Sequence, residues 1–241
     1  MKIARDTCIE CQLCIPYCPM NAIHGGRDGV IIDEEECVEC NICRHAEVCP
    51  TDALVSGELK WPRSVRRSFS DPLVTHEETG VPGRGTEEMK TNEVTGRFQH
   101  GWVGLGVELG RPGIGTTFRD VERVAQAVAQ HDIHFEKHNP VYSLMKDGAR
   151  GELREDILQE KVLSAIVEFT ARLDDVPAIL ESIKEVANHV DTVFSLDMAC
   201  RVSPDGSVPA LARADEAGFS VSINGKVNVG LGRPLATEVP Q

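Results

Sequence analysis

The sequence predicts an α+β protein in three successive parts. A small cysteine-rich unit over residues 1–58 is followed by a connector over residues 59–100 and by a βαββαβ sandwich with a C-terminal hairpin over residues 101–241. Eight of the nine cysteines lie between residues 8 and 50, which defines the first part. The connector is rich in Pro, Gly, Ser and charge without a sustained period, whereas apolar residues after residue 101 recur at strand or helix spacing.

The cysteine-rich unit contains an internal duplication. The segment CIECQLCIPYCP is followed by CVECNICRHAEVCP, so each half has a C-x2-C-x2-C triplet and then a cysteine with proline behind it. A cubane iron–sulfur cluster needs four thiolates around one small volume, and the triplet supplies three of them from one tight loop. In a two-cluster arrangement the fourth thiolate comes from the other half. We therefore predict a pair of iron–sulfur clusters.

Two other kinds of site also use clustered cysteines. Structural zinc sites are built from C-x2-C pairs rather than from triplets with a distant Cys-Pro. Disulfides need an oxidising compartment, and Met1–Thr7 is too short and too polar for an export signal. Both alternatives fit the spacing less well than iron–sulfur clusters do.

The same stretch resembles the bacterial two-[4Fe–4S] ferredoxins over residues 1–58. The resemblance implies an electron carrier with two [4Fe–4S] clusters. The implied ligands are Cys8, Cys11, Cys14 and Cys49 for one cluster, and Cys37, Cys40, Cys43 and Cys18 for the other.

The second motif departs from the ferredoxin pattern. Five residues separate Cys43 from Cys49, where three separate Cys14 from Cys18. We expect this longer turn, which carries His45, to change the exposure and the potential of the cluster that Cys49 binds.

The whole chain is acidic, with 25 Lys and Arg against 38 Asp and Glu and a net charge of −13. Nucleic acid and anionic membranes are therefore poor partners. The sequence has no apolar run of 18 residues, which argues against membrane insertion. Thiolate clusters without an export signal predict a reducing, anoxic cytoplasm.

Acidic residues are concentrated in the first unit, because the first 60 residues carry 11 acidic and 5 basic side chains. Such a surface suits docking to a basic patch on a redox partner. The expected contacts are Glu34, Glu35, Glu36 and Glu39.

The connector contains one basic island, WPRSVRRSFSDP, with Trp61, Arg63, Arg66 and Arg67 close together. One interpretation is a docking or anion-binding arm. The other is an arm that pairs with the acidic unit of the same chain, and the overall acidity favours it.

Residues 101–241 show the periods of successive strands and helices. Trp102–Leu109 alternates as a strand does, and Thr117 can cap a helix that runs to Gln130. The pattern of strand, helix and strand then recurs. The further expected elements are an extended stretch over Ile133–Met145 broken near Pro140, a short helix within residues 148–161, a strand over Leu163–Phe169, a helix from Asp175 to Val190, a strand over Val193–Val202 and a hairpin turn at Asn224-Gly225.

Two such units most economically form one four-stranded antiparallel sheet with both helices on one face. This is the ferredoxin-like βαββαβ plan, which is shared by many small ligand-binding and regulatory domains such as ACT-like ones. The plan by itself assigns no function.

The segment GRPGIGTT, Gly110–Thr117, joins the first strand to the first helix, where backbone amides can hold an anion. The position of the P-loop lysine holds Thr116, so an ATPase is excluded. The candidate recognition residues are Arg111, Gly113 and Gly115. The alternative is a tight turn whose glycines serve geometry alone.

The sheet face opposite the helices is expected to gather polar side chains. Glu108 and Glu168 are its candidate recognition residues, and a ligand surface or a homo-oligomer or subunit interface would use them. The alternative is an antiparallel sheet with one wet face. The other members of this expected face are Ser164, Thr170, Ser195, Asp197 and Arg201.

Four further residues have less specific patterns. His131, His134 and His138 could bind a metal, although exposed histidines at a strand edge are more common. Cys200 falls on the apolar side of its strand, which predicts an inert core residue.

Together these features predict a low-potential electron-transfer protein or subunit that delivers electrons to a partner oxidoreductase or a larger oxidoreductase complex. The chain has no recognisable site for a hydride cofactor, so other subunits are expected to provide the reductase. Two alternatives remain. One is an iron–sulfur reductase whose C-terminal domain binds substrate, and the other is a redox subunit in which a bound ligand regulates electron flow.

Overall fold

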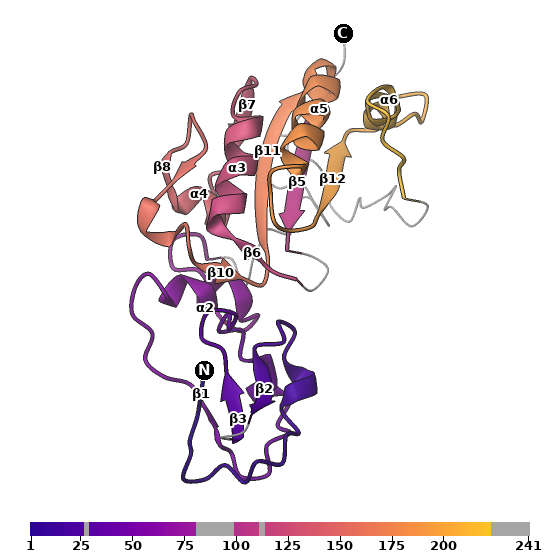
Figure 1. Ribbon diagram of the computed structural model, residues 1–241. Coiled ribbons are helices and arrows are strands. Elements are labelled where there is room, and N and C mark those ends of the chain that lie inside the picture. The colour runs from indigo at the N-terminus through magenta and orange to yellow at the C-terminus, as the bar shows by residue number, and fades with distance from the viewer. Residues whose placement is uncertain (27–28, 81–98, 111–113, 223–241) are drawn as a thin grey trace.

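The structure is a computed structural model that describes residues 1–26, 29–80, 99–110 and 114–222. Figure 1 shows the cysteine-rich unit at one end of the molecule and a larger unit of sheet and helices at the other. Helix α2 (Ser64–Ser70) of the connector lies between them. Within the described ranges, no helix is both long enough and apolar enough to cross a membrane.

Short strand pairs frame the cysteine-rich unit. β1 (Lys2–Ile3) pairs with β4 (Leu54–Val55), and β2 (Ile23–Gly26) pairs with β3 (Gly29–Ile32), both antiparallel. The first pair joins the two ends of the unit. A 3-10 turn, η1 (Ile15–Tyr17), and helix α1 (Ile42–His45) lie in the loops of the two cysteine motifs. A small buried cluster, with cysteines packed against it, consists of Met1, Ile23, Val30, Cys43 and Leu54.

A four-stranded sheet organises the larger unit. Its strands are β5 (Trp102–Leu109), β7 (Ile133–Phe135), β11 (Ala165–Arg172) and β12 (Phe194–Cys200). They pair in the order β12-β5-β11-β7, and all neighbours are antiparallel. Helix α3 (Phe118–Val128) follows β5, helix α5 (Val176–Ala187) follows β11, and the two helices pack against each other. This strand order is the one that a βαββαβ arrangement produces.

Helix α3 begins and packs as its sequence predicts. Thr117 Oγ1 accepts a hydrogen bond from the Asp120 amide at 3.3 Å, which caps the first turn. Helix α5 differs, because Asp175 makes no side-chain capping bond and a 3-10 turn, η3 (Leu173–Asp175), leads into the helix instead. The residues of α3 predicted to face the core are all fully buried: Phe118, Val121, Val124, Ala125 and Val128.

The region between the two halves of the sheet differs most from expectation. The predicted extended stretch Ile133–Met145 is a strand only as far as Phe135, because Asn139 caps a short helix, α4 (Pro140–Ser143), that begins at the proline. The predicted helix within residues 148–161 is wrong, since Gly151, at φ +68°, permits a tight turn. The elements found there are β8 (Met145–Asp147) paired with β9 (Glu152–Leu153), the 3-10 turn η2 (Glu155–Ile157), and β10 (Lys161–Val162) paired with β6 (Thr116–Thr117).

The C-terminal part gives two further outcomes. A helix, α6 (Pro209–Glu216), follows β12 and packs against α5, although no such helix was expected. Its sequence PALARADE has a weak helical stripe in which only Ala210 and Ala214 are buried. The hairpin predicted at Asn224-Gly225 lies outside the described residues.

The sheet face opposite the helices is buried along β5 and β11 and is exposed at the edge strand β12, where Ser195 and Asp197 face solvent. Seven of the eight residues of β11 are buried, on both of its faces. The exposed fractions of Glu108 and Glu168 are only 6% and 2%. The Asn139 side-chain amide donates to Glu168 Oε2 at 3.3 Å, so part of this face is covered by the segment before α4.

Candidate metal centres

The cysteine-rich unit encloses two cavities, and four cysteines line each one. The cavity that we call the outer site is lined by Cys8, Cys11, Cys14 and Cys49. The inner site is lined by Cys18, Cys37, Cys40 and Cys43. Each site thus combines the triplet of one motif with the Cys-Pro cysteine of the other motif, as the folded duplication brings them together.

The backbone of both triplets turns in the same unusual way. Glu10 and Gln12 in the first motif have φ of 59° and 62°, and Glu39 and Asn41 at the equivalent places in the second have φ of 57° and 56°. A left-handed conformation at a residue other than glycine costs about 1–3 kcal/mol and persists where the surroundings impose it. Here it turns successive thiols towards one cavity. The repetition in both motifs indicates a geometric requirement of the sites.

The fourth cysteine of each site is held by an equivalent hydrogen bond. The amide of Ala22 donates to Cys18 Sγ, and the amide of Ala53 donates to Cys49 Sγ, both at 3.2 Å. Burial alone would raise the pKa of Cys49, but hydrogen bonds from nearby backbone amides lower it below its ordinary value. The matching CPMNA and CPTDA tails therefore place an equivalent amide donor on the fourth sulfur in each half.

The inner site is the more deeply buried of the two. Burial, reinforced by the neighbouring thiols, raises the pKa of Cys40 to about 11 and that of Cys43 to about 12. These thiols can be deprotonated at neutral pH only if cations compensate their charge, which bound metal does. Four soft thiolates around one cavity fit an iron–sulfur cluster. Among the described residues, no three His, Cys, Asp or Glu side chains converge to hold a single ion.

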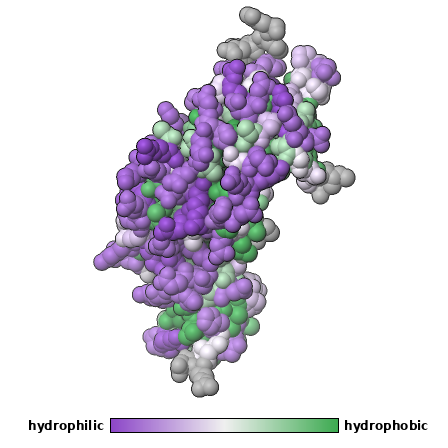
Figure 2. Space-filling model, turned by 45° about the horizontal axis from the view of Figure 1, so that its top comes forward, coloured by the Kyte–Doolittle hydropathy of each residue, from purple (hydrophilic) through white to green (hydrophobic). Residues whose placement is uncertain are grey.

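The outer site is more accessible. Cys11 is exposed, whereas the exposed fractions of Cys40 and Cys43 in the inner site are 8% and 7%. Ile9 and Leu13, beside Cys11, are 62% and 53% exposed. Figure 2 shows apolar side chains gathered at the end of the molecule that the cysteine-rich unit forms. A protein partner can therefore approach the outer site more closely than the inner one.

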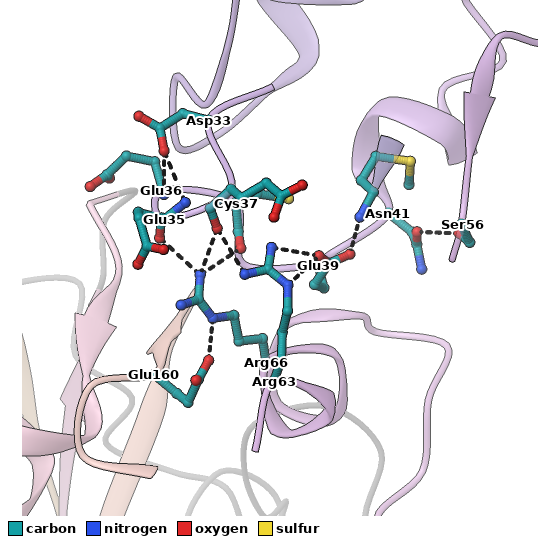
Figure 3. Close-up of polar contacts among 12 residues, drawn as sticks. Asp33, Glu35, Glu36, Cys37, Glu39, Asn41, Ser56, Arg63, Arg66 and Glu160 are labelled. Atoms are coloured by element: carbon teal, nitrogen blue, oxygen red, sulfur yellow. Dashed lines mark hydrogen bonds and ion pairs between the residues drawn. The ribbon is translucent and has the colours of Figure 1, made fainter. Parts of the chain in front are cut away.

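Two arginines of the connector bind the loop that carries Cys37, as Figure 3 shows. Arg63 pairs with Glu39, with 2.8 Å between Nη2 and Oε1. Burial would raise the pKa of Glu39, but the Met1 amine and Arg63 outweigh it and lower that pKa. Arg66 donates to the carbonyl oxygens of residues 34, 35 and 37. The contacts of both arginines are intramolecular, as the second interpretation of the basic island requires.

These contacts leave part of the predicted acidic docking surface unavailable. Glu39 is only 1% exposed, and Glu36 pairs with Lys161 of the larger unit at 2.5 Å. Glu34 and Glu35 remain exposed at this edge. The prediction that all four glutamates contact a partner is therefore wrong for Glu39, because its carboxylate is buried and pairs with Arg63 of the same chain.

The turn between β5 and α3 lies against the inner site. A Cβ atom at Gly115, where φ is +73°, would come within 2.7 Å of Met20 Cε and 2.9 Å of the Val162 carbonyl oxygen. Leu163 packs with Met20 against the same apolar cluster, which includes Cys40. The glycine at position 115 thus permits close contact between the two units, a long-range role that glycine spacing alone does not reveal.

The anion-binding hypothesis for this turn gains no support from the described amides. The amides of Gly115, Phe118 and Arg119 donate to the carbonyl oxygens of Gly110, Glu160 and Leu158. Arg111 and Gly113 lie outside the described residues. A recognition role for this turn, or for Glu108 and Glu168, stays a prediction.

The remaining candidates lie apart from the two cavities. The ring of His131 hydrogen-bonds to Ser182 Oγ at 2.8 Å, and His134 packs against Trp102. Cys200 is half-buried and packs against the main core, and burial raises the pKa of its thiol. His138 lies just before the short α4 helix, and its backbone amide donates to Glu136 Oε1 at 2.7 Å.

The fold and the donor set of the first unit define an iron–sulfur protein. The family of 4Fe-4S binding domains matches residues 1–24. Ferredoxin-1 of Caulobacter vibrioides is 32% identical over 104 residues, which cover 40% of this chain and 88% of that protein. Ferredoxin-3 and Ferredoxin-2 of Chlorobaculum tepidum are 39% and 42% identical over 61 and 55 residues, which cover 24% and 21% of this chain and 97% and 87% of the two proteins.

The chain therefore belongs to the ferredoxins through its N-terminal part, and it is an iron–sulfur electron carrier there. The remainder matches no named family. No solved structure matches the chain.

Proposed function

We propose that this chain is a low-potential electron-transfer protein or subunit that carries two [4Fe–4S] clusters and delivers electrons to a partner oxidoreductase. The observation that carries the proposal is the pair of cavities with four cysteines each. One cluster belongs to the outer site and the other to the inner site. When bound, such clusters supply one-electron transfer, at potentials set by hydrogen bonds, charge and exposure.

The residues around each site hold the thiolates and exclude water. The amides of Ala22 and Ala53 donate to the fourth sulfur of each site. Ile23 and Leu54, which follow these alanines, are buried at the two cavities. The equivalent position of these residues in both halves supports the same kind of cluster in each site. The different burial of the two sites supports different roles in electron transfer.

We assign the exchange of electrons with the partner to the outer site. Electron transfer slows steeply with distance, so the exposed Cys11 favours this site as the contact point. The inner site lies against the larger unit, beside Met20 and Leu163. A reducing, anoxic cytoplasm suits eight thiolate ligands.

The first test is metal content. We expect about eight iron and eight sulfide per chain, because each site has four thiolates for one [4Fe–4S] cluster. Anaerobic reconstitution followed by iron, sulfide and zinc analysis measures this. About four iron per chain would contradict a second cluster, and zinc in place of iron would contradict both. Substrate turnover by the isolated chain with a chemical reductant would support the reductase alternative instead.

The second test concerns docking. Leu13→Gln should slow electron transfer to a small acceptor protein such as cytochrome c by about fivefold, as loss of one strong apolar contact does. Leu13 is 53% exposed beside the outer site, so the change should leave iron content intact. Stopped-flow reduction of cytochrome c measures the rate.

Two controls accompany this docking test. Leu73→Gln, at a position 74% exposed in the connector, should leave the rate unchanged. A double variant with Glu34→Gln and Glu35→Gln tests the acidic surface that the sequence predicted. If this variant and added salt slow the reaction more than Leu13→Gln does, docking occurs at the acidic edge.

A further inference from the structure

A buried arginine lies between the inner site and the larger unit. Arg66 is on α2 and is only 3% exposed. Its Nη1 donates to three carbonyl oxygens of the cysteine loop, those of Glu34 at 3.1 Å, Glu35 at 2.8 Å and Cys37 at 3.0 Å. Figure 3 shows the guanidinium pointing at this loop from the connector helix.

The other edge of the same guanidinium meets a carboxylate of the larger unit. Arg66 Nε donates to Glu160 Oε2 at 2.5 Å, and the Glu160 side chain is 14% exposed. The neighbouring Arg63 is compensated separately by Glu39. The Arg66 guanidinium therefore contacts the backbone of the inner-site residue Cys37 through Nη1 and the carboxylate of Glu160 through Nε.

Charges in this position act on the redox equilibrium of the inner site. Reduction adds one negative charge to a cluster, and a buried cation beside it stabilises the reduced form more than it would in water. A carboxylate paired with that cation has the opposite effect, because its negative charge disfavours the reduced form. The two residues should therefore shift the reduction potential in opposite directions.

We propose that Arg66 and Glu160 act as a pair of positioning residues that set the reduction potential of the inner cluster, so that the larger unit tunes a cluster that it does not ligate. Arg66 raises the potential and Glu160 lowers it. The proposal rests on the proposed function, because it requires a cluster in the inner site. It gives the larger unit a role in electron transfer that needs no ligand.

The test compares Arg66→Gln, Glu160→Gln and the double variant in the iron-loaded full chain. A redox titration followed by EPR gives the potentials of both clusters. We expect the inner potential to fall in Arg66→Gln and to rise in Glu160→Gln, each by about tenfold in the reduction equilibrium, about 59 mV for one electron. The double variant should return close to the unaltered protein. The outer potential should stay constant in all three.

The directions of the shifts in reduction potential distinguish an electrostatic role of Arg66 and Glu160 from a merely structural one. If the pair only held the two units together, either single change would loosen the junction and shift the inner potential in the same direction. Arg66→Lys keeps the charge while losing part of the hydrogen bonding, so its potential should stay near that of the unaltered protein. Arg150→Gln, in an exposed hairpin pair with Glu152, is the matched control and should shift neither potential.

The outcomes distinguish this inference from the proposed function. Shifts of the same sign in Arg66→Gln and Glu160→Gln, or a large shift in Arg66→Lys, overturn the tuning role while both clusters are still present. Failure of the unaltered chain to bind iron in the inner site overturns the proposed function itself. If Arg66→Gln does not fold, Glu160→Gln still decides the sign, and Arg66→Lys still separates the effect of the charge from that of the hydrogen bonds.

Discussion

Cys18→Ala should remove the cluster of Cys37, Cys40 and Cys43 and leave the other cluster intact. Cys18 lines the inner site although it belongs to the first motif. Loss of one of four thiolate ligands in a buried site leaves the cluster without a complete ligand set. Iron content should fall from about eight to about four per chain. EPR spectra of the reduced protein should retain the signal of the outer site alone.

Cys49→Ala is the reciprocal variant and should remove the outer cluster. Cys49 comes from the second motif but lines the cavity with the first triplet. Cys200→Ala is the matched control, because Cys200 packs against the core of the larger unit and its substitution should not affect iron content. Spectra in which Cys18→Ala damages the site of Cys8, Cys11 and Cys14 would contradict the crossed assignment.

Phe118→Ala should destabilise the larger unit by about 3–5 kcal/mol, the usual cost of deleting a buried aromatic ring. Phe118 is fully buried at the start of α3 and packs edge-to-face on Phe69 of α2, with ring centroids 5.0 Å apart. The substitution removes core contacts in the larger unit and the aromatic contact between that unit and the connector helix. Chemical denaturation followed by circular dichroism measures the loss of unfolding free energy.

Leu211→Ala is the control for this prediction, since Leu211 is 40% exposed on α6 and its truncation should cost less than 1 kcal/mol. The cysteine-rich unit has a core of its own, so iron content at low denaturant should be unchanged in both variants. A loss below about 1 kcal/mol in Phe118→Ala would mean that the core closes around the missing ring.

Local patterns in the sequence predicted the elements whose stabilisation is itself local. The spacing of the cysteines indicated iron–sulfur sites, because three ligands of each site come from one short loop. Trp102–Leu109 is the strand that its alternation predicts, and Thr117 caps the helix that its stripe predicts. The errors within residues 133–161 arose where proline and glycine geometry overrode a short apolar pattern.

Only the tertiary structure decided how the two units meet. Arg66 pairs with Glu160, and Lys161 pairs with Glu36. The absence of a side chain at Gly115 leaves room for Met20. The two partners in each of these contacts lie far apart in the sequence. The spacing of residues along the sequence does not predict such pairs. A charged residue is expected at the solvated surface unless a segment that is distant in the sequence packs over it. The burial of Glu39 and Glu168 follows the same rule. The sequence by itself determined the iron–sulfur chemistry of the cysteines and the regular elements. Contacts between residues that are distant in the sequence determined which charged side chains lie beside the cysteine sites.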